Sequence, residues 1–128
     1  MSSKSKGSNK ERELLHILWR KGLPTLRCAG SGSMKYPGPD LIASNKSRVL
    51  AIECKSTKEK KKYLDEEDVQ QLKEFCDIFG AEPWFAVRFA RKDWLFLSLE
   101  DIEKTENGYV IDAKIAERRG LLIDELIK

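Results

Sequence analysis

The chain has 128 residues, of which 41% are hydrophobic and 35% charged, and its formal net charge is +3. This length suits one domain that buries a core without disulfide or metal support. Its three cysteines lack CxxC spacing, one histidine offers no zinc site, and no apolar run approaches the roughly 20 residues that cross a bilayer. We therefore expect a soluble, cytoplasmic protein with reduced thiols and no membrane segment.

The first predicted element is an amphipathic helix that starts at Ser8, where residues 8–11 have the form of a capping box. Residues 1–7 form an arm of Ser, Lys and Gly that we expect to be flexible and basic, and residues 8–128 form a single domain. Glu11 has two interpretations. It is either a capping glutamate, or a carboxylate at the helix start that faces a site formed further along the chain.

A short edge strand is predicted over residues 23–28, followed by a loop over 29–38 that is rich in Gly and Ser. Small residues and hydroxyls can donate to a phosphate, but they are equally compatible with flexibility alone. Ser31, and after it Ser33, are the candidate contacts in this loop.

Two strands over residues 38–43 and 49–55, joined by a polar loop, form the predicted centre of a sheet. The second begins with four consecutive apolar residues, as expected for a strand that is buried on both faces. Glu53 and Lys55 are two positions apart, so both side chains point to one face, while Cys54 between them points back to the core.

Asp40 stands at the start of the first of these strands, thirteen positions before Glu53. The pattern of Pro-Asp followed by Glu-x-Lys resembles the PD-(D/E)xK motif of metal-dependent DNA endonucleases. Phosphodiester hydrolysis needs hard oxygen ligands for Mg²⁺ and a cation beside the attacking water. On this interpretation Asp40, Glu53 and the Cys54 carbonyl hold the metal, while the lysine orients or deprotonates the water. On spacing alone, a surface hairpin with a Glu–Lys pair is the alternative.

The segment over residues 56–62 is rich in lysine and forms either a solvated loop or a contact with a DNA backbone. Asp65 then caps a helix that ends at Gly80. The remaining predicted elements are strands over 84–87 and 94–97 joined by a basic turn, a helical turn over 99–102, a short strand over 109–111 and a short amphipathic helix over 120–128.

The helix over 66–79 carries more apolar surface than one sheet face needs, because Phe75 and Phe79 add to an already apolar stripe. We expect at least one phenylalanine, Phe75 in preference, to lie on an exposed patch of the kind that marks a dimer interface. Leu95 or Phe96 from the neighbouring strand would complete this patch. A wide core stripe is the alternative.

Five segments together resemble the archaeal Holliday junction resolvases, in the same order and with similar spacing over residues 8–97. They are KERELL at 10–15, RCAGS at 27–31, PDLIA at 39–43, IECKS at 52–56 and the F-x3-FG pattern at 75–80. The resemblance implies an α/β, restriction-endonuclease-like nuclease fold in which helices flank a mixed central β-sheet. The tail after Ser98 matches poorly, so nothing is implied for it.

In that family a glutamate of the first helix, an aspartate, a glutamate and a lysine form the active site, and they correspond here to Glu11, Asp40, Glu53 and Lys55. Glu11 is then an additional metal ligand, and Ser31 is the closest match to a serine that also contributes. The resemblance implies a homodimer that binds branched DNA and cuts two opposed strands of a four-way junction with Mg²⁺, for which Mn²⁺ substitutes, in DNA recombination and repair. The residues expected to contact DNA are Lys4, Lys6, Lys10, Arg27, Ser33, Lys35, Lys58, Lys60, Lys61, Lys62, Arg91 and Lys92.

Two other functions are compatible with the sequence. A nuclease of the same fold could act on nicks, flaps or duplex sites, and a non-catalytic DNA-binding module could carry the carboxylates for structural reasons alone. Metal-dependent cleavage separates an enzyme from a binding module, and comparison of junctions with duplex DNA separates the two enzymes.

Overall fold

The computed structural model describes residues 3–28 and 36–128, with side chains from Asn9 onward in the first range. The elements are α1 (Ser3–Arg20), β1 (Thr25–Arg27), β2 (Leu41–Ser44), β3 (Val49–Thr57), β4 (Lys61–Asp65), α2 (Glu66–Phe79), β5 (Glu82–Phe89), β6 (Leu95–Leu97), the 3-10 turn η1 (Leu99–Asp101), β7 (Glu103–Lys104), β8 (Gly108–Asp112), α3 (Ala113–Arg119) and α4 (Ile123–Leu126). Within the described residues, no helix has the length and apolar character needed to span a bilayer.

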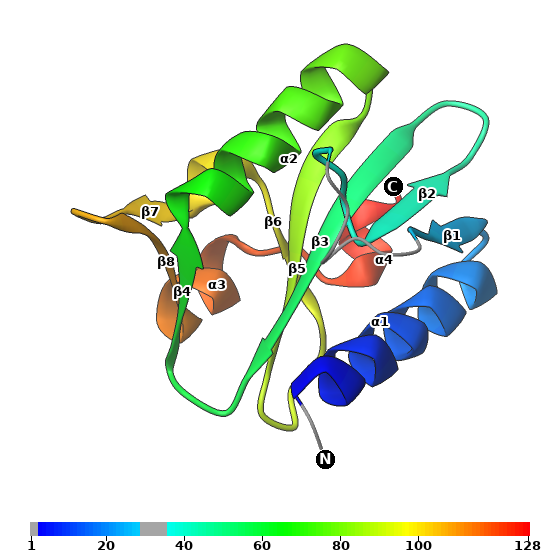
Figure 1. The fold of residues 1–128 in the computed structure, drawn as a ribbon. Coiled ribbons are helices and arrows are strands. Elements are labelled where there is room, and N and C mark those ends of the chain that lie inside the picture. The colour runs from blue at the N-terminus through cyan, green and yellow to red at the C-terminus, as the bar shows by residue number, and fades with distance from the viewer. Residues whose placement is uncertain (1–2, 29–35) are drawn as a thin grey trace.

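A five-stranded mixed sheet in the order β1-β2-β3-β5-β6 forms the centre of the molecule (Figure 1). β2 and β3 form the predicted antiparallel hairpin, in which Leu41 lies opposite Ile52. β3 and β5 run parallel, because the chain crosses over between them through β4 and α2. The predicted mixed sheet flanked by helices is confirmed.

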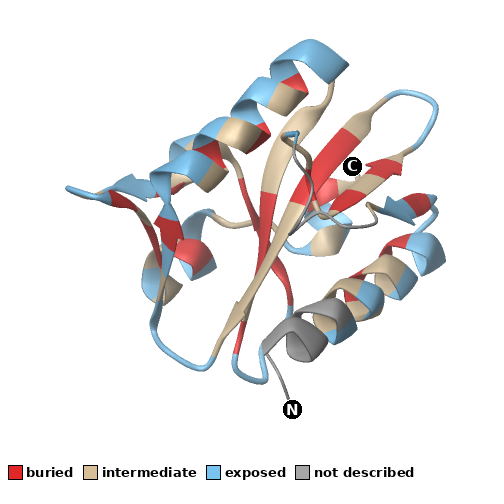
Figure 2. Cartoon of the chain, viewed as in Figure 1, coloured by how far each residue is buried: buried red, intermediate tan, exposed pale blue. Residues whose placement is uncertain are grey.

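Helices cover both faces of this sheet, so its central strands are buried on both sides (Figure 2). α1 and α4 pack on one face, around Leu14 and Leu18, and α2 and α3 pack on the other, around Leu72. We call the core beneath α1 and α4 the α1 cluster and the core beneath α2 and α3 the α2 cluster. Neighbouring residues of β3 alternate between them, since Ala51 belongs to the α2 cluster and Ile52 to the α1 cluster. Burial on both faces explains why β3 begins with a run of apolar residues.

α1 begins at Ser3, so the predicted start at Ser8 is wrong and residues 3–7 are helical in place of the arm expected there. Lysine is a good helix former, and one glycine inside a long helix costs only about 1 kcal/mol. Glu11 therefore lies in the interior of α1, where a residue cannot cap the helix. The interpretation of Glu11 as a capping glutamate is excluded.

A smaller antiparallel sheet has the order β4-β8-β7. Residues 56–57 belong to β3, and Lys61 and Lys62 belong to β4, so only residues 58–60 of the lysine-rich segment lie outside a strand. The tail contains α3, a helix that the sequence did not predict, whose start is capped by Asp112 through a 2.9 Å hydrogen bond from the N–H of Lys114. α4 is shorter than the helix predicted over residues 120–128.

Leu95 and Phe96 are core residues, which contradicts the expectation that they complete an exposed patch. Their exposed fractions are 8% and 0%. The two side chains alternate across β6, and Leu95 packs in the α2 cluster while Phe96 packs in the α1 cluster. Phe96 also exchanges two backbone hydrogen bonds with Leu121, so the tail lies along the outer edge of β6.

Candidate active site

The backbone holds Asp40 between two strands at the start of β2. Its N–H donates to the carbonyl of Ile52 in β3 at 3.0 Å, and its carbonyl accepts from the N–H of Cys28 at 2.9 Å. Because Leu41 pairs with Ile52, Asp40 lies beside Glu53. The hairpin therefore brings the two carboxylates together, as their spacing predicted.

Side-chain contacts place the ammonium of Lys55 next to Glu53. The N–H of Cys54 donates to Asp40 Oδ2 at 2.8 Å. Lys55 Nζ lies 3.8 Å from Glu53 Oε2 and 4.0 Å from Asp68 Oδ2, in the first turn of α2. Glu53 and Lys55 thus share one face of β3 as predicted, and their side chains are only 15% and 23% exposed.

Glu53 is a buried acid beside a second acid. Burial, and after it the charge of Asp40, raises the pKa of Glu53 to about 8, although the charge of Lys55 acts in the opposite direction. The pKa of Glu11 is also raised, first by burial and then by the charge of Asp40, while Arg27 lowers it. Carboxylates that repel one another in this way are stabilised when a cation binds among them.

The donor set suits a hard divalent cation. Asp40 and Glu53 provide carboxylate oxygens, and a hard cation prefers oxygen to sulfur, so the Cys54 backbone carbonyl suits it better than the Cys54 thiol. Across the described ranges, no three His, Cys, Asp or Glu side chains form a group that could hold a metal by themselves. Mg²⁺ usually takes one or two carboxylates and keeps several waters, so two carboxylates fit it.

Glu11 reaches this region from α1 and is 16% exposed. Arg27 Nε of β1 donates to Glu11 Oε1 at 3.1 Å, which joins the helix to the edge of the sheet. Arg27, expected as a DNA contact, is therefore already paired with a residue of the site.

Comparison with known proteins decides the family. A model of the archaeal Holliday junction resolvase (Hjc) family matches residues 2–128. The chain belongs to this family. The crossover junction endodeoxyribonuclease Hjc of Archaeoglobus fulgidus is 43% identical over 112 residues, which cover 88% of this chain and 82% of that protein. Hjc of Methanocaldococcus jannaschii is 39% identical over 110 residues, which cover 86% of this chain and 78% of that protein.

A solved structure of A. fulgidus Hjc, described as a Holliday junction resolvase from an archaeal hyperthermophile, matches the fold of this family member. Its TM-score is 0.90 at 38% sequence identity, and the match covers 95% of this chain and 100% of that chain. The predicted restriction-endonuclease-like fold is thereby confirmed.

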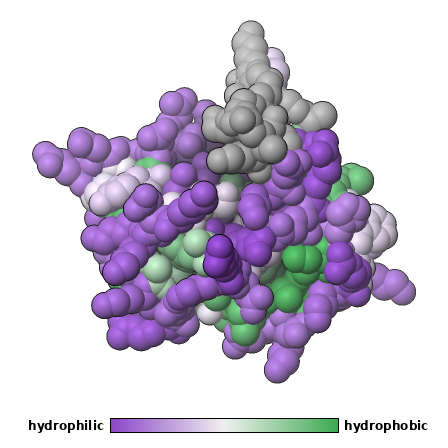
Figure 3. Space-filling model, turned by 90° about the horizontal axis from the view of Figure 1, so that it is seen from below, coloured by the Kyte–Doolittle hydropathy of each residue, from purple (hydrophilic) through white to green (hydrophobic). Residues whose placement is uncertain are grey.

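Five of the exposed basic residues of this Hjc family member lie on or beside two turns at one end of the sheet. They are Lys58 and Lys60 with Lys61 at the start of β4, and Arg91 and Lys92 between β5 and β6. In Figure 1 these turns lie at the bottom, where α1 also starts, and Figure 3 views that end as a largely hydrophilic surface. Besides Arg27, two further residues predicted to contact DNA already have partners, since Lys92 pairs with Glu117 and Lys10 with Glu13 at 3.6 Å. Lys62 is half-buried.

The structure does not describe the side chains of five of the residues that the sequence predicts for the site or for DNA contacts. Ser31, Ser33 and Lys35 lie outside the described residues, as do the side chains of Lys4 and Lys6. Their predicted roles rest on the sequence and on the family resemblance.

Asp68 is the residue of this site that sequence reasoning missed. It is one of three acidic residues in the first turn of α2, a position that favours negative charge in any helix. Its contact with Lys55 arises because α2 packs with its first turn against β3. The sequence contains one indication of this contact: Asp68 stands in the first turn of the helix that follows the lysine-rich segment, and that segment follows Lys55.

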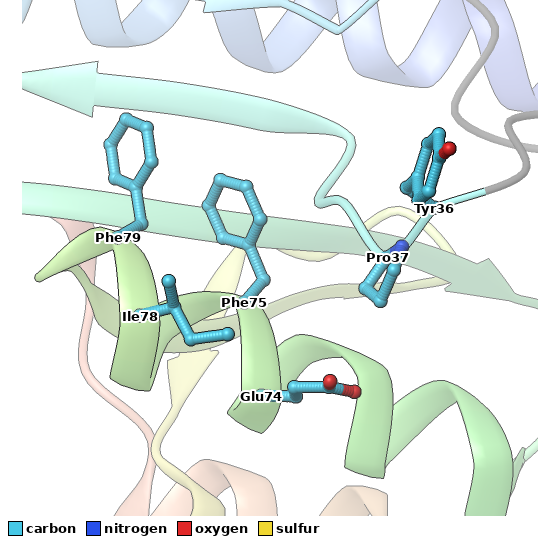
Figure 4. Close-up of a pocket in the computed structure, with 6 residues that line it drawn as sticks. All are labelled: Tyr36, Pro37, Glu74, Phe75, Ile78 and Phe79. Atoms are coloured by element: carbon cyan, nitrogen blue, oxygen red, sulfur yellow. The ribbon is translucent and has the colours of Figure 1, made fainter.

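An apolar surface on α2 surrounds Phe79. The rings of Phe75 and Phe79 stack with centroids 4.8 Å apart. Phe79 is 56% and Ile78 is 81% exposed, whereas Phe75 is partly buried against the core, so the preference for Phe75 as the exposed ring is wrong. These side chains and Tyr36 and Pro37 line a hollow of about 310 Å³ (Figure 4). We call these five residues the α2 apolar surface.

Proposed function

We propose that the chain resolves four-way DNA junctions by hydrolysing one phosphodiester bond in each of two opposed strands, with Mg²⁺ as the metal and Mn²⁺ as a substitute. As a member of the Hjc family it is a crossover junction endodeoxyribonuclease. The observation that carries the chemistry is the convergence of Asp40, Glu53 and Lys55 at the β2–β3 hairpin. Unpaired thiols in all three cysteines support a reducing, cytoplasmic location.

Asp40, Glu53 and the Cys54 carbonyl would hold the metal, and Glu11, which among the described residues does not form a three-carboxylate group with them, would add negative charge nearby. When bound, the divalent cation supplies positive charge that polarises the scissile phosphate. The N–H of Cys54 keeps the Asp40 carboxylate in a fixed orientation. The ammonium of Lys55 orients the attacking water and offsets the negative charge that develops on the phosphate. By the family resemblance, the hydroxyl of Ser31 would add a further contact.

DNA would lie across the end of the sheet that carries the two basic turns. The exposed lysines at 58, 60 and 61, and Arg91 on the neighbouring turn, support contacts with phosphates, which position a protein on DNA without reading its sequence. Selectivity for a junction would then come from the shape of the branched DNA rather than from contacts with bases.

Two copies would pair through the α2 apolar surface. Tyr36, Ile78 and Phe79 are all more than half exposed, and exposed patches of this kind mark interfaces. A two-fold dimer repeats the same surface on both copies and holds two active sites in a fixed relative orientation. Symmetric cleavage of two opposed strands requires such a pair of sites.

The test is cleavage of an immobile four-way junction beside its separate duplex arms, in Mg²⁺, in Mn²⁺ and in EDTA. We expect paired cuts in opposed strands of the junction in either metal, and none in EDTA or on duplex. Equal cleavage of duplex, nicked or flapped DNA would favour a nuclease of another specificity. Tight binding without cleavage in any metal would favour a DNA-binding module.

A further inference from the structure

We infer that Asp68 is a positioning residue, which holds the ammonium of Lys55 in place for catalysis. The inference rests on the role proposed above for Lys55. Lys55 Nζ lies between carboxylates of two different elements, 3.8 Å from Glu53 Oε2 in its own strand and 4.0 Å from Asp68 Oδ2 in α2. The second contact joins α2 to the five-stranded sheet at the site itself.

A second carboxylate partner matters for Lys55 because a lysine side chain is flexible. Its ammonium ends a flexible four-carbon stem, so what pairs with it decides where it lies. Glu53 is two positions away on the same strand and is assigned to the metal, so its carboxylate has a competing task. Asp68 has no such task, and it approaches from a helix whose position is fixed by the burial of Val69 and Leu72.

The alternative is that Asp68 merely stabilises the start of α2. Negative charge in a first turn favours any helix, and Glu66 and Glu67 share that turn. Their contacts differ, however, since Glu66 pairs with Lys104 at 3.1 Å and Glu67 accepts a 3.2 Å hydrogen bond from Gln71. Glu67 therefore has the same charge in the same turn without the contact to Lys55, which makes it a matched control.

The test compares Asp68→Asn with Glu67→Gln, each of which removes one negative charge from this turn. In single-turnover cleavage of a saturated junction, Asp68→Asn should be about tenfold slower, because a misplaced catalytic group slows chemistry. Its junction affinity should be unchanged or tighter, since it loses negative charge near the DNA. Glu67→Gln should cleave at the rate of the unmodified protein. Asp68→Glu should recover most of the rate, because it restores a carboxylate within reach of Lys55.

A double-mutant cycle tests whether Asp68 acts through Lys55. In a Lys55→Met background, Asp68→Asn should cause no further loss of the residual rate. Asp68→Ser is made alongside, so that the result does not depend on the folding of one variant. Equal rates for Asp68→Asn and Glu67→Gln, or an undiminished further loss beside Lys55→Met, would overturn this inference alone. Full activity of Lys55→Met, or no cleavage by the unmodified protein, would overturn the proposed function and the inference with it.

Discussion

Glu53→Gln should stabilise the metal-free protein at alkaline pH, although it removes a proposed metal ligand. Burial, followed by the charge of Asp40, raises the pKa of Glu53 from 4.5 to about 8. The pKa in the folded chain thus lies above that in the unfolded chain. Stability contributed by this group is fully present below pH 4.5 and is lost as the pH rises through about 8.

The magnitude follows from the shift. The difference between 8 and 4.5 is about 3.5 units, and each unit is worth about 1.4 kcal/mol, so ionised Glu53 lowers the free energy of unfolding by at most about 5 kcal/mol. Relaxation and water penetration reduce the cost of a buried charge, so we expect about 2–4 kcal/mol. A glutamine at 53 cannot ionise, and its NH₂ group can donate to Asp40 as the protonated acid does.

Urea unfolding in EDTA at about pH 5.5, 7 and 9 measures this effect. The unmodified protein should lose stability as the pH rises, and Glu53→Gln should lose much less. Glu82→Gln is a control of opposite sign, because a hydrogen bond from Arg48 lowers the pKa of Glu82 and its contribution is lost as the pH falls. That variant should be less stable by about 1 kcal/mol at neutral pH. The same pH dependence in Glu53→Gln and the unmodified protein would show that Glu53 carries no such cost.

Alanine variants of the four site residues should each abolish most junction cleavage but retain junction binding in gel assays: Asp40→Ala, Glu53→Ala, Lys55→Ala and Glu11→Ala. These side chains stabilise the transition state, whereas phosphate contacts elsewhere supply the affinity. Full activity in any of the first three variants would contradict the assignment. Neutralising the lysines at 58, 60 and 61 should flatten the slope of log K for DNA binding against log salt, by about 0.9 for each phosphate that the protein no longer neutralises. The control variant Lys46→Ala, in the β2–β3 turn, should leave this slope unchanged. If neutralising the lysines at 58, 60 and 61 also left the slope unchanged, those lysines would be solvated side chains that do not contact DNA. Phe79→Ala and Ile78→Ala should sediment as folded monomers that lose paired cleavage, whereas Phe75→Ala should also lower the melting temperature, since its ring packs on the core. Dimers retained in the first two would rule out this interface.

The sequence by itself determined the local geometry of the site. A strand has a side-chain period of two, so Glu53 and Lys55 share a face whatever else the chain does. A short polar loop between two strands makes a hairpin, which brings Asp40 to the same place. The end of α2 was also readable, because Gly80 adopts a left-handed φ of 85° that suits glycine.

Only the tertiary structure decided which distant elements meet. Asp68 contacts Lys55 and Arg27 contacts Glu11 because α2 and α1 pack at particular positions on the sheet. The tail that lines β6 and the helices on both faces bury Leu95 and Phe96, which local pattern alone left exposed. Periodicity reports which face of an element a residue occupies, but strand register and long-range packing decide what covers that face.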